Sequence, residues 1–238
     1  MYKRQVKYLL PAYGALLVLG LTWPFFLPGE AFALRDMMVL PDMALTRASL
    51  GFGDLPARNV PQDALLGIVP FPVVLVRVLV VGAAAAAAFA GHRLGTHALG
   101  KAAAMTVAVW NPLVIERLLQ GQWSLAVAAW LIPLVALGGR ASPLAQWVAS
   151  LTPTGAIAAA CFVRDRVGVV VAVLACAPWV VAGALATGGG TATPESAAAF
   201  APRAEQYVGT LGALMGLGGI WNGAAVPASR EVGFALFG

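Results

Sequence analysis

The sequence predicts an all-α membrane protein, a polytopic transmembrane bundle of about seven spans with a large external loop after the first span. Of its 238 residues, 60% are hydrophobic and only 11% are charged, and the mean hydropathy is +0.83. Apolar runs of about 20 residues, the length that crosses a bilayer core, recur along the chain. We expect a single transmembrane domain over residues 1–238, in a chain that ends on an apolar run and reads as a fragment of a longer protein.

The first spans set the expected orientation. Lys3, Arg4 and Lys7 precede or begin the first apolar run, which has no small-residue cleavage pattern, so we expect an uncleaved anchor with a cytoplasmic N-terminus in the plasma membrane. Residues 28–72 then form an external loop with an interfacial segment, and residues 73–238 hold the remaining spans. The expected spans are 6–27, 73–90, 98–115, 123–137, 144–163, 167–186 and 208–226.

Two features of the spans predict details of packing. The alanine run 83–88 predicts a face of close helix contact, because small residues let helix backbones approach each other in lipid. The sequence Thr-Pro-Thr-Gly at 152–155 lies within the fifth expected span, where proline removes a backbone hydrogen bond and permits a break. A broken or re-entrant helix there would return Arg164 and Arg166 to the cytoplasm.

Charge and motifs exclude several functions. The net charge of +5 comes from basic residues scattered at span ends and not gathered on one face, so no nucleic-acid partner is expected. Cys161 and Cys176 fall in apolar runs without a partner at metal-ligand spacing. No hydrolase elbow and no zinc-peptidase motif is present, and no metal site is predicted.

The external loop after the first span concentrates acidic residues. Asp36 follows that span by about nine residues, which places it near the bilayer surface, where a general base could reach a membrane-held substrate. Asp42 and Asp54 are secondary candidates, as an alternative base or as oxygen ligands for a divalent cation, the only cofactor left open. The simpler alternative is that each acid is a turn residue or pairs with a nearby arginine.

Two arginines are candidate ligands for a lipid phosphate. Arg77 stands a few residues into the second span, where a guanidinium either binds a partner or snorkels to the interface. Its planar fork matches phosphate oxygens in a bidentate way. Arg203, in a later external loop, is either a phosphate ligand or a solvated loop residue.

The segment 111–123, Asn-Pro-Leu-Val-Ile-Glu-Arg-Leu-Leu-Gln-Gly-Gln-Trp, joins the third and fourth spans and is rich in polar groups. Helical spacing could place these side chains on one face above the membrane, with the tryptophan at headgroup depth. A sugar pocket could use all of them, and a plain helix cap with an interfacial tryptophan is equally consistent. The candidates are Glu116, Arg117, Gln120, Gln122 and Trp123.

The segment 111–123 and the later Gly-Gly-Ile-Trp-Asn at 218–222 resemble segments of bacterial and archaeal membrane glycosyltransferases of the GT-C fold. A short N-terminus, one span and a large external loop with an acid soon after the span also match that architecture. The resemblance implies inverting sugar transfer from a polyprenyl phosphate donor at the extracytoplasmic side, with Asp36 as base. In the hypothesis that follows, we expect Arg35, Arg77 and Arg117 to hold the phosphate. The residues expected to orient the sugars are Glu116, Gln120, Gln122 and Trp123.

Two further functions stay open. A non-catalytic membrane subunit or lipid-binding scaffold would use the polar loops as an interface with other protein subunits, with membrane lipids as its ligands. A transporter would need ionisable residues along a path at mid-membrane, and the sequence offers few.

Overall fold

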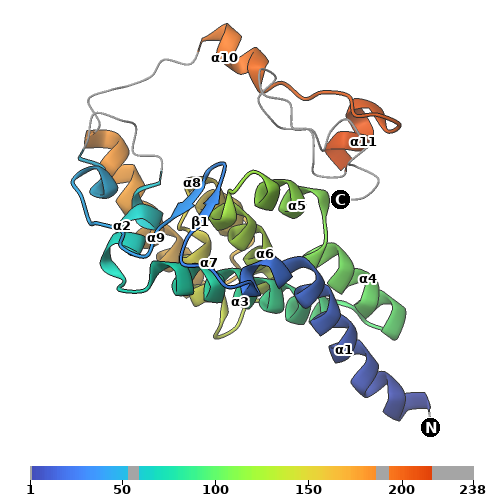
Figure 1. The fold of residues 1–238 in the computed structure, drawn as a ribbon. Coiled ribbons are helices and arrows are strands. Elements are labelled where there is room, and N and C mark those ends of the chain that lie inside the picture. Colours follow the sequence, from blue (N-terminus) through green and yellow to red (C-terminus); the bar gives the residue numbers. More distant parts are fainter. Residues whose placement is uncertain (1, 53–58, 186–192, 216–238) are drawn as a thin grey trace.

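The computed structural model describes residues 2–52, 59–185 and 193–215, which are mostly helical (Figure 1). Among these residues, four apolar stretches are long enough to cross a membrane, as a helical membrane protein requires: Tyr8–Phe26, Pro72–Leu94, Ala98–Leu119 and Arg166–Leu185. The corresponding elements are α1 (Tyr2–Thr22) with the 3-10 turn η1 (Trp23–Phe26), α3 (Pro72–Leu94), α4 (Ala98–Val109) with α5 (Pro112–Leu119), and α9 (Arg166–Leu185).

The core forms around α3, which packs against α1, α4 and α6 (Trp123–Leu137). The predicted alanine face is confirmed, because Ala84 and Ala87 are fully buried there. Two hydrogen bonds tie the neighbouring helices together. Tyr13 and Thr106 share a hydroxyl hydrogen bond of 2.6 Å between α1 and α4. Trp130 of α6 donates from Nε1 to the carbonyl of Val109 at 2.9 Å, which satisfies an acceptor at the end of α4.

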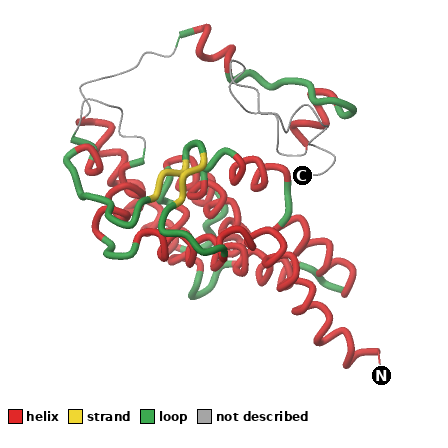
Figure 2. Tube along the Cα trace, in the orientation of Figure 1, coloured by secondary structure: helices red, strands yellow, loops and turns green. Residues whose placement is uncertain are grey.

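The loop after the first span contains a small β-hairpin, so the expectation of an all-α fold is wrong in this region. Strand β1 (Phe32–Leu34) pairs antiparallel with β2 (Met37–Val39), and Figure 2 shows this pair against the helices. Met37 and Val39 are buried on one side of the hairpin while Met38 is exposed, the alternation that a half-buried strand requires. The loop continues through η2 (Ala48–Leu50) and α2 (Val60–Ile68).

The fifth expected span is broken where the Thr-Pro-Thr-Gly sequence predicts. Two helices of eight residues, α7 (Ser142–Ala149) and α8 (Pro153–Ala160), replace one long helix. Gln146 of α7 is fully buried and donates from Nε2 to the carbonyl of Ala156 in α8 at 3.2 Å. The break is therefore a packed feature of the bundle, and neither half is long enough to cross a bilayer.

The expectation of seven spans is wrong for the described residues. Helix α6 has 15 residues and is shorter than a full crossing. Of the last expected span, 208–226, only α11 (Gly209–Met215) is described, and α10 (Pro194–Ala199) precedes it. Figure 1 shows α10 and α11 standing away from the other helices. The orientation of the N-terminus stays a prediction.

Candidate functional site

A polar pocket of about 400 Å³ opens where the hairpin turn, the start of α2, the start of α6 and the α7–α8 break meet. This volume is in the range of small-molecule sites. Its lining combines one carboxylate with amide and hydroxyl groups, and it includes no Lys or Arg among the described residues. The lining residues are Asp36, Asn59, Gln62, Gly121, Gln122, Trp123, Ser124, Leu125, Thr152, Pro153 and Thr154.

Asp36 reaches this pocket because the hairpin turn is clamped to the chain between α5 and α6. The turn consists of Arg35 and Asp36, and Arg35 has a φ of +50°, a conformation that hairpin turns usually give to glycine. The backbone N–H of Asp36 donates to the carbonyl of Gln120 at 3.1 Å. Gly121, with a φ of +78°, lies so close to the hairpin that a Cβ there would collide with the Leu34 carbonyl. The predicted base is therefore held by backbone contacts.

Side chains of the 111–123 segment continue the clamp. Gln122 donates from Nε2 to Oδ2 of Asp36 at 2.8 Å, and its Oε1 accepts from Nη1 of Arg117 at 2.7 Å. Nη2 of Arg117 donates to Oε1 of Glu116 at 3.0 Å, an ion pair in which the glutamate side chain is only 1% exposed. A buried charge requires such a partner. Four residues predicted as site residues are thus joined in one network.

The local sequence explains why this segment folds as it does. Asn111 caps α5, because its side-chain oxygen accepts from the N–H of Val114 at 3.0 Å, and Pro112 occupies the first turn. Asn111 and Pro112 thus begin the helical part of the segment. Gln120 is the C-cap residue of α5, and the following glycine supplies the left-handed conformation that returns the chain toward α6.

Two features of this segment differ from expectation. Trp123 is only 2% exposed, so its ring is packed in the core and does not lie in an interfacial aromatic belt as predicted. Glu116 is buried beside Arg117 and does not share an exposed face with Gln120. Trp123 and Met37 of the hairpin belong to the same hydrophobic core, and the sequence pattern did not reveal the hairpin.

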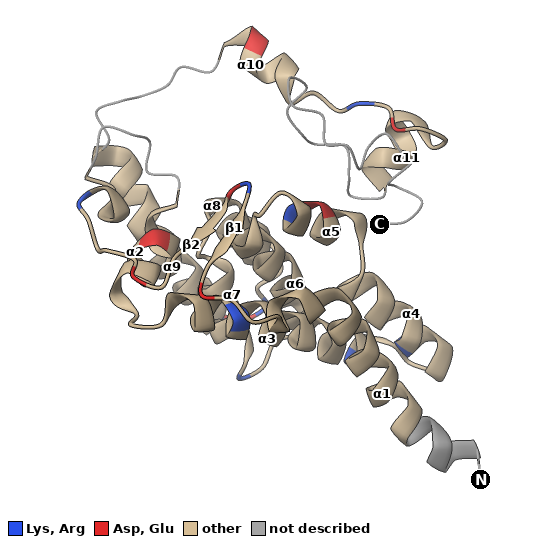
Figure 3. Ribbon diagram, viewed as in Figure 1, with Lys and Arg blue, Asp and Glu red and all other residues tan. Residues whose placement is uncertain are grey.

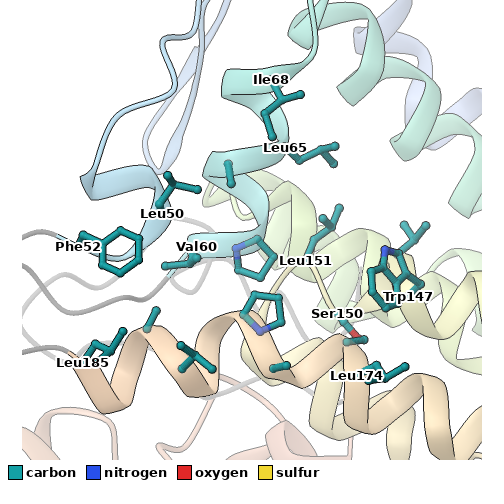
Figure 4. A pocket seen from close by; sticks show the side chains of 18 of the residues that line it. Leu50, Phe52, Val60, Leu65, Ile68, Trp147, Ser150, Leu151, Leu174 and Leu185 are labelled. Carbon is teal, nitrogen blue, oxygen red and sulfur yellow. The ribbon is translucent and has the colours of Figure 1, made fainter.

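An open apolar cavity of about 750 Å³ lies beside the polar pocket and is lined by residues of η2, α2, α3, α7 and α9 (Figure 4). Its walls are almost entirely aliphatic and aromatic, with Leu65, Trp147 and Leu174 among them. Consecutive residues line the two spaces. Leu151 lines the apolar cavity and Thr152 the polar pocket at the α7–α8 break, and Pro61 and Gln62 do the same in α2.

The other predicted site residues lie elsewhere. Arg77 donates from Nη2 to the carbonyls of Leu27 at 3.1 Å and Gly29 at 2.9 Å, and its guanidinium lies 5.4 Å from the Phe32 ring centre. Arg203 donates to the carbonyls of residues 198 and 199 at the end of α10. Asp42 is exposed and outside the pocket lining. Asp54 and the 218–222 segment lie outside the described residues.

Sequence reasoning missed the residues that α2 and α6 bring to the pocket. Asn59, Gln62 and Ser124 line it, but each is a single polar residue without a motif around it. Thr152 and Thr154 belong to the predicted helix break, a pattern that indicates topology and not a binding site. A proline break that leaves polar side chains at membrane depth is itself a pointer to a cavity.

Charged residues of both signs lie beside this site. Figure 3 shows both signs at the hairpin turn and on α5, whereas the long helices carry few charged residues. Among the described residues, no group of three acidic, histidine or cysteine side chains is arranged to hold a metal ion. No family model, curated protein or solved structure matches the chain.

Proposed function

We propose that this membrane protein transfers a sugar from a polyprenyl phosphate donor to an acceptor hydroxyl, at the extracytoplasmic face of the plasma membrane. The observation that carries the proposal is the position of Asp36, on the wall of a polar pocket that begins where a large apolar cavity ends. An amphiphilic substrate with a polyhydroxylated head and an isoprenoid tail matches this pair of spaces.

The chemistry of the polar pocket favours an uncharged, hydroxyl-rich group. Amides and hydroxyls both donate and accept hydrogen bonds, as sugar hydroxyls require. The lining contains no basic side chain among the described residues, so no positive charge there would offset the negative charge of a phosphate. The phosphate therefore stays at the mouth of the pocket, and the sugar enters.

The proposed reaction is an inverting displacement. The acceptor oxygen attacks the anomeric carbon, its proton passes to the Asp36 carboxylate, and the bond to the lipid phosphate breaks with its electron pair on the phosphate oxygen. Among the described residues that line the pocket, Asp36 is the only carboxylate. A single base suffices, because a phosphate leaving group needs no protonation.

The test is sugar transfer by purified protein in liposomes. Radiolabelled polyprenyl phosphate hexoses and pentoses serve as donors and alkyl glycosides as acceptors. Replacing Asp36→Asn keeps the volume but removes the base, so transfer should fall by about 10²- to 10⁴-fold. Asp42→Asn, in the same loop but outside the pocket, is the matched control and should retain transfer. Full activity of the Asp36→Asn protein would refute the proposal.

One observation favours a second function, a non-catalytic lipid-binding subunit. Arg77, the strongest predicted phosphate ligand, binds backbone carbonyls of its own chain and is absent from the pocket lining. Two results together would favour this function. The purified protein would show no transfer with any donor, and it would co-purify with a stoichiometric protein partner that is lost when the 111–123 segment is mutated.

A further inference from the structure

The hydrogen bonds between Arg117, Gln122 and Asp36 have a fixed direction. A guanidinium can only donate and an ionised carboxylate can only accept. Gln122 lies between them, with Oε1 2.7 Å from Arg117 and Nε2 2.8 Å from Asp36. Only this orientation of the amide satisfies both neighbours, because the reversed amide would place N–H against N–H and oxygen against oxygen. Arg117 therefore determines which face of Gln122 meets Asp36.

Glu116 holds the arginine in turn. Its side chain is 1% exposed and that of Arg117 is 13% exposed, and 3.0 Å separates their charged atoms. The two terminal nitrogens of the guanidinium thus make two different contacts, one with Glu116 and one with Gln122. A planar fork engaged at both ends has little rotational freedom. We expect this arginine to orient the amide, in place of the phosphate-binding role predicted from sequence.

The result at Asp36 is a carboxylate held in one orientation. Its backbone N–H donates to Gln120, and Oδ2 accepts from Gln122. Among the described residues, no hydrogen bond reaches Oδ1. This leaves Oδ1 as the oxygen that can accept a proton from a substrate hydroxyl in the pocket.

We infer that Gln122 is a positioning residue for Asp36, and that Glu116 and Arg117 set the direction of its amide. We call these three residues the relay: the buried ion pair fixes the Gln122 amide, and the amide in turn fixes the carboxylate of the proposed base. The catalytic consequence rests on the proposed function, whereas the relay itself is a property of the structure and can be tested without activity.

The first experiment measures the relay alone. Protein in nanodiscs is treated with a water-soluble carbodiimide and glycine ethyl ester, and labelling of Asp36 is followed by mass spectrometry. Gln122→Met preserves length but removes the amide that covers Oδ2, so labelling should accelerate by at least about threefold. Gln206→Met changes an exposed glutamine outside the pocket and is the matched control. Equal labelling rates in wild-type and Gln122→Met protein would overturn the inference, whether or not the chain is an enzyme.

A double-mutant cycle tests the order of the relay. Arg117→Met releases the amide, so labelling should rise about as much as in Gln122→Met, and the double variant should label no faster than Gln122→Met alone. Because Arg117→Met removes the ion pair that Arg117 makes with the buried Glu116, Glu116→Gln with Arg117→Met is the second variant if the first does not fold. Independent, multiplying effects of the two substitutions would contradict a relay.

The transfer assay then tests the catalytic consequence. A lost hydrogen bond to a charged group should lower kcat by about 10- to 100-fold in Gln122→Met. KM should change much less than kcat, because Arg117 and Asp36 already engage both polar atoms of the Gln122 amide. If Asp36→Asn is inactive while Gln122→Met has wild-type kcat, the positioning role fails and the proposed function stands. If Asp36→Asn is fully active, the proposed function fails and only the labelling result bears on the relay.

Discussion

Gln122 donates a hydrogen bond of 2.8 Å to Asp36, a residue 86 positions earlier in the chain. This contact joins the turn of the hairpin to the connection between α5 and α6. It brings the strongest acid candidate of the sequence together with the polar 111–123 segment. The pocket exists because these two parts of the chain are clamped together, so several predictions concern the clamp.

Gly121 is the residue at which the clamp is most sensitive. Its φ of +78° disfavours any side chain, and a Cβ would collide with the backbone of the hairpin. Gly121→Ala should lower the free energy of unfolding by about 1–3 kcal/mol. The measurement is thermal unfolding in detergent. Gly82→Ala is the control, because that helical glycine has no neighbour within 4 Å of an added Cβ. Equal unfolding temperatures for the two variants would contradict the close contact.

Arg77 should act as a structural tether. It holds the carbonyls of Leu27 and Gly29 from α3, so Arg77→Met would leave those acceptors to find other partners. We expect a loss of about 1–3 kcal/mol in unfolding free energy, partly restored in Arg77→Lys, whose single ammonium can still donate. Urea unfolding in mixed micelles measures this loss of unfolding free energy. An Arg77→Met protein with unchanged stability but abolished lipid binding would instead indicate a phosphate ligand.

The bond between Trp130 and Val109 should stabilise the contact between α6 and the end of α4. Trp130 is fully buried, so Trp130→Phe leaves a buried carbonyl without its indole donor. The expected cost is about 1–3 kcal/mol in the free energy of unfolding. Trp147→Phe, at a ring that is 52% exposed, should cost much less. The comparison is made by thermal unfolding, and a larger effect at Trp147 would count against the predicted bond.

The start of α10 should depend on pH. The backbone N–H of Glu195 and the Thr193 side chain hold the pKa of the Glu195 carboxyl below its usual value of 4.5. A lowered pKa in the folded state means that the stabilisation is present above the unfolded value and is lost as pH falls through the folded one. Hydrogen exchange of residues 194–199, corrected for intrinsic rates, should lose protection at acidic pH. Glu195→Gln should remove that dependence, and identical pH profiles in both proteins would contradict it.

The long helices could be predicted from sequence because hydrophobic length alone determines them. The expected span 73–90 corresponds to Pro72–Leu94, and 167–186 to Arg166–Leu185. The break at 152–155 was also predictable, since proline cannot donate the backbone hydrogen bond that a continuous helix needs. Local chemistry determines each of these features.

The hairpin and the pocket could not be predicted in the same way. Strands of three residues are too short to show a clear alternation of apolar and polar residues. The turn also has Arg35 at a position where a glycine usually marks a hairpin in the sequence. The distance of Asp36 from the first span makes it a candidate, whereas its contact with Gln122 depends on tertiary packing. Residues such as Asn59 reach the pocket only because α2 folds back over the α7–α8 break, and no local pattern encodes that approach.

The central claim is that the polar pocket and the apolar cavity bind one substrate together. Its most direct test is photolabelling with a polyprenyl phosphate that carries a diazirine in its isoprenoid tail. If the apolar cavity holds the tail, crosslinks should map to α2, α7 and α9, around residues such as Leu65 and Leu174. Leu174→Trp, which narrows the cavity at the α9 wall, should reduce them, whereas Val107→Trp on an exposed surface of α4 should not. A different result would contradict a site formed by the polar pocket and the apolar cavity together. In that result, the crosslinks are spread evenly over the exposed surfaces of all the long helices and are unaffected by Leu174→Trp.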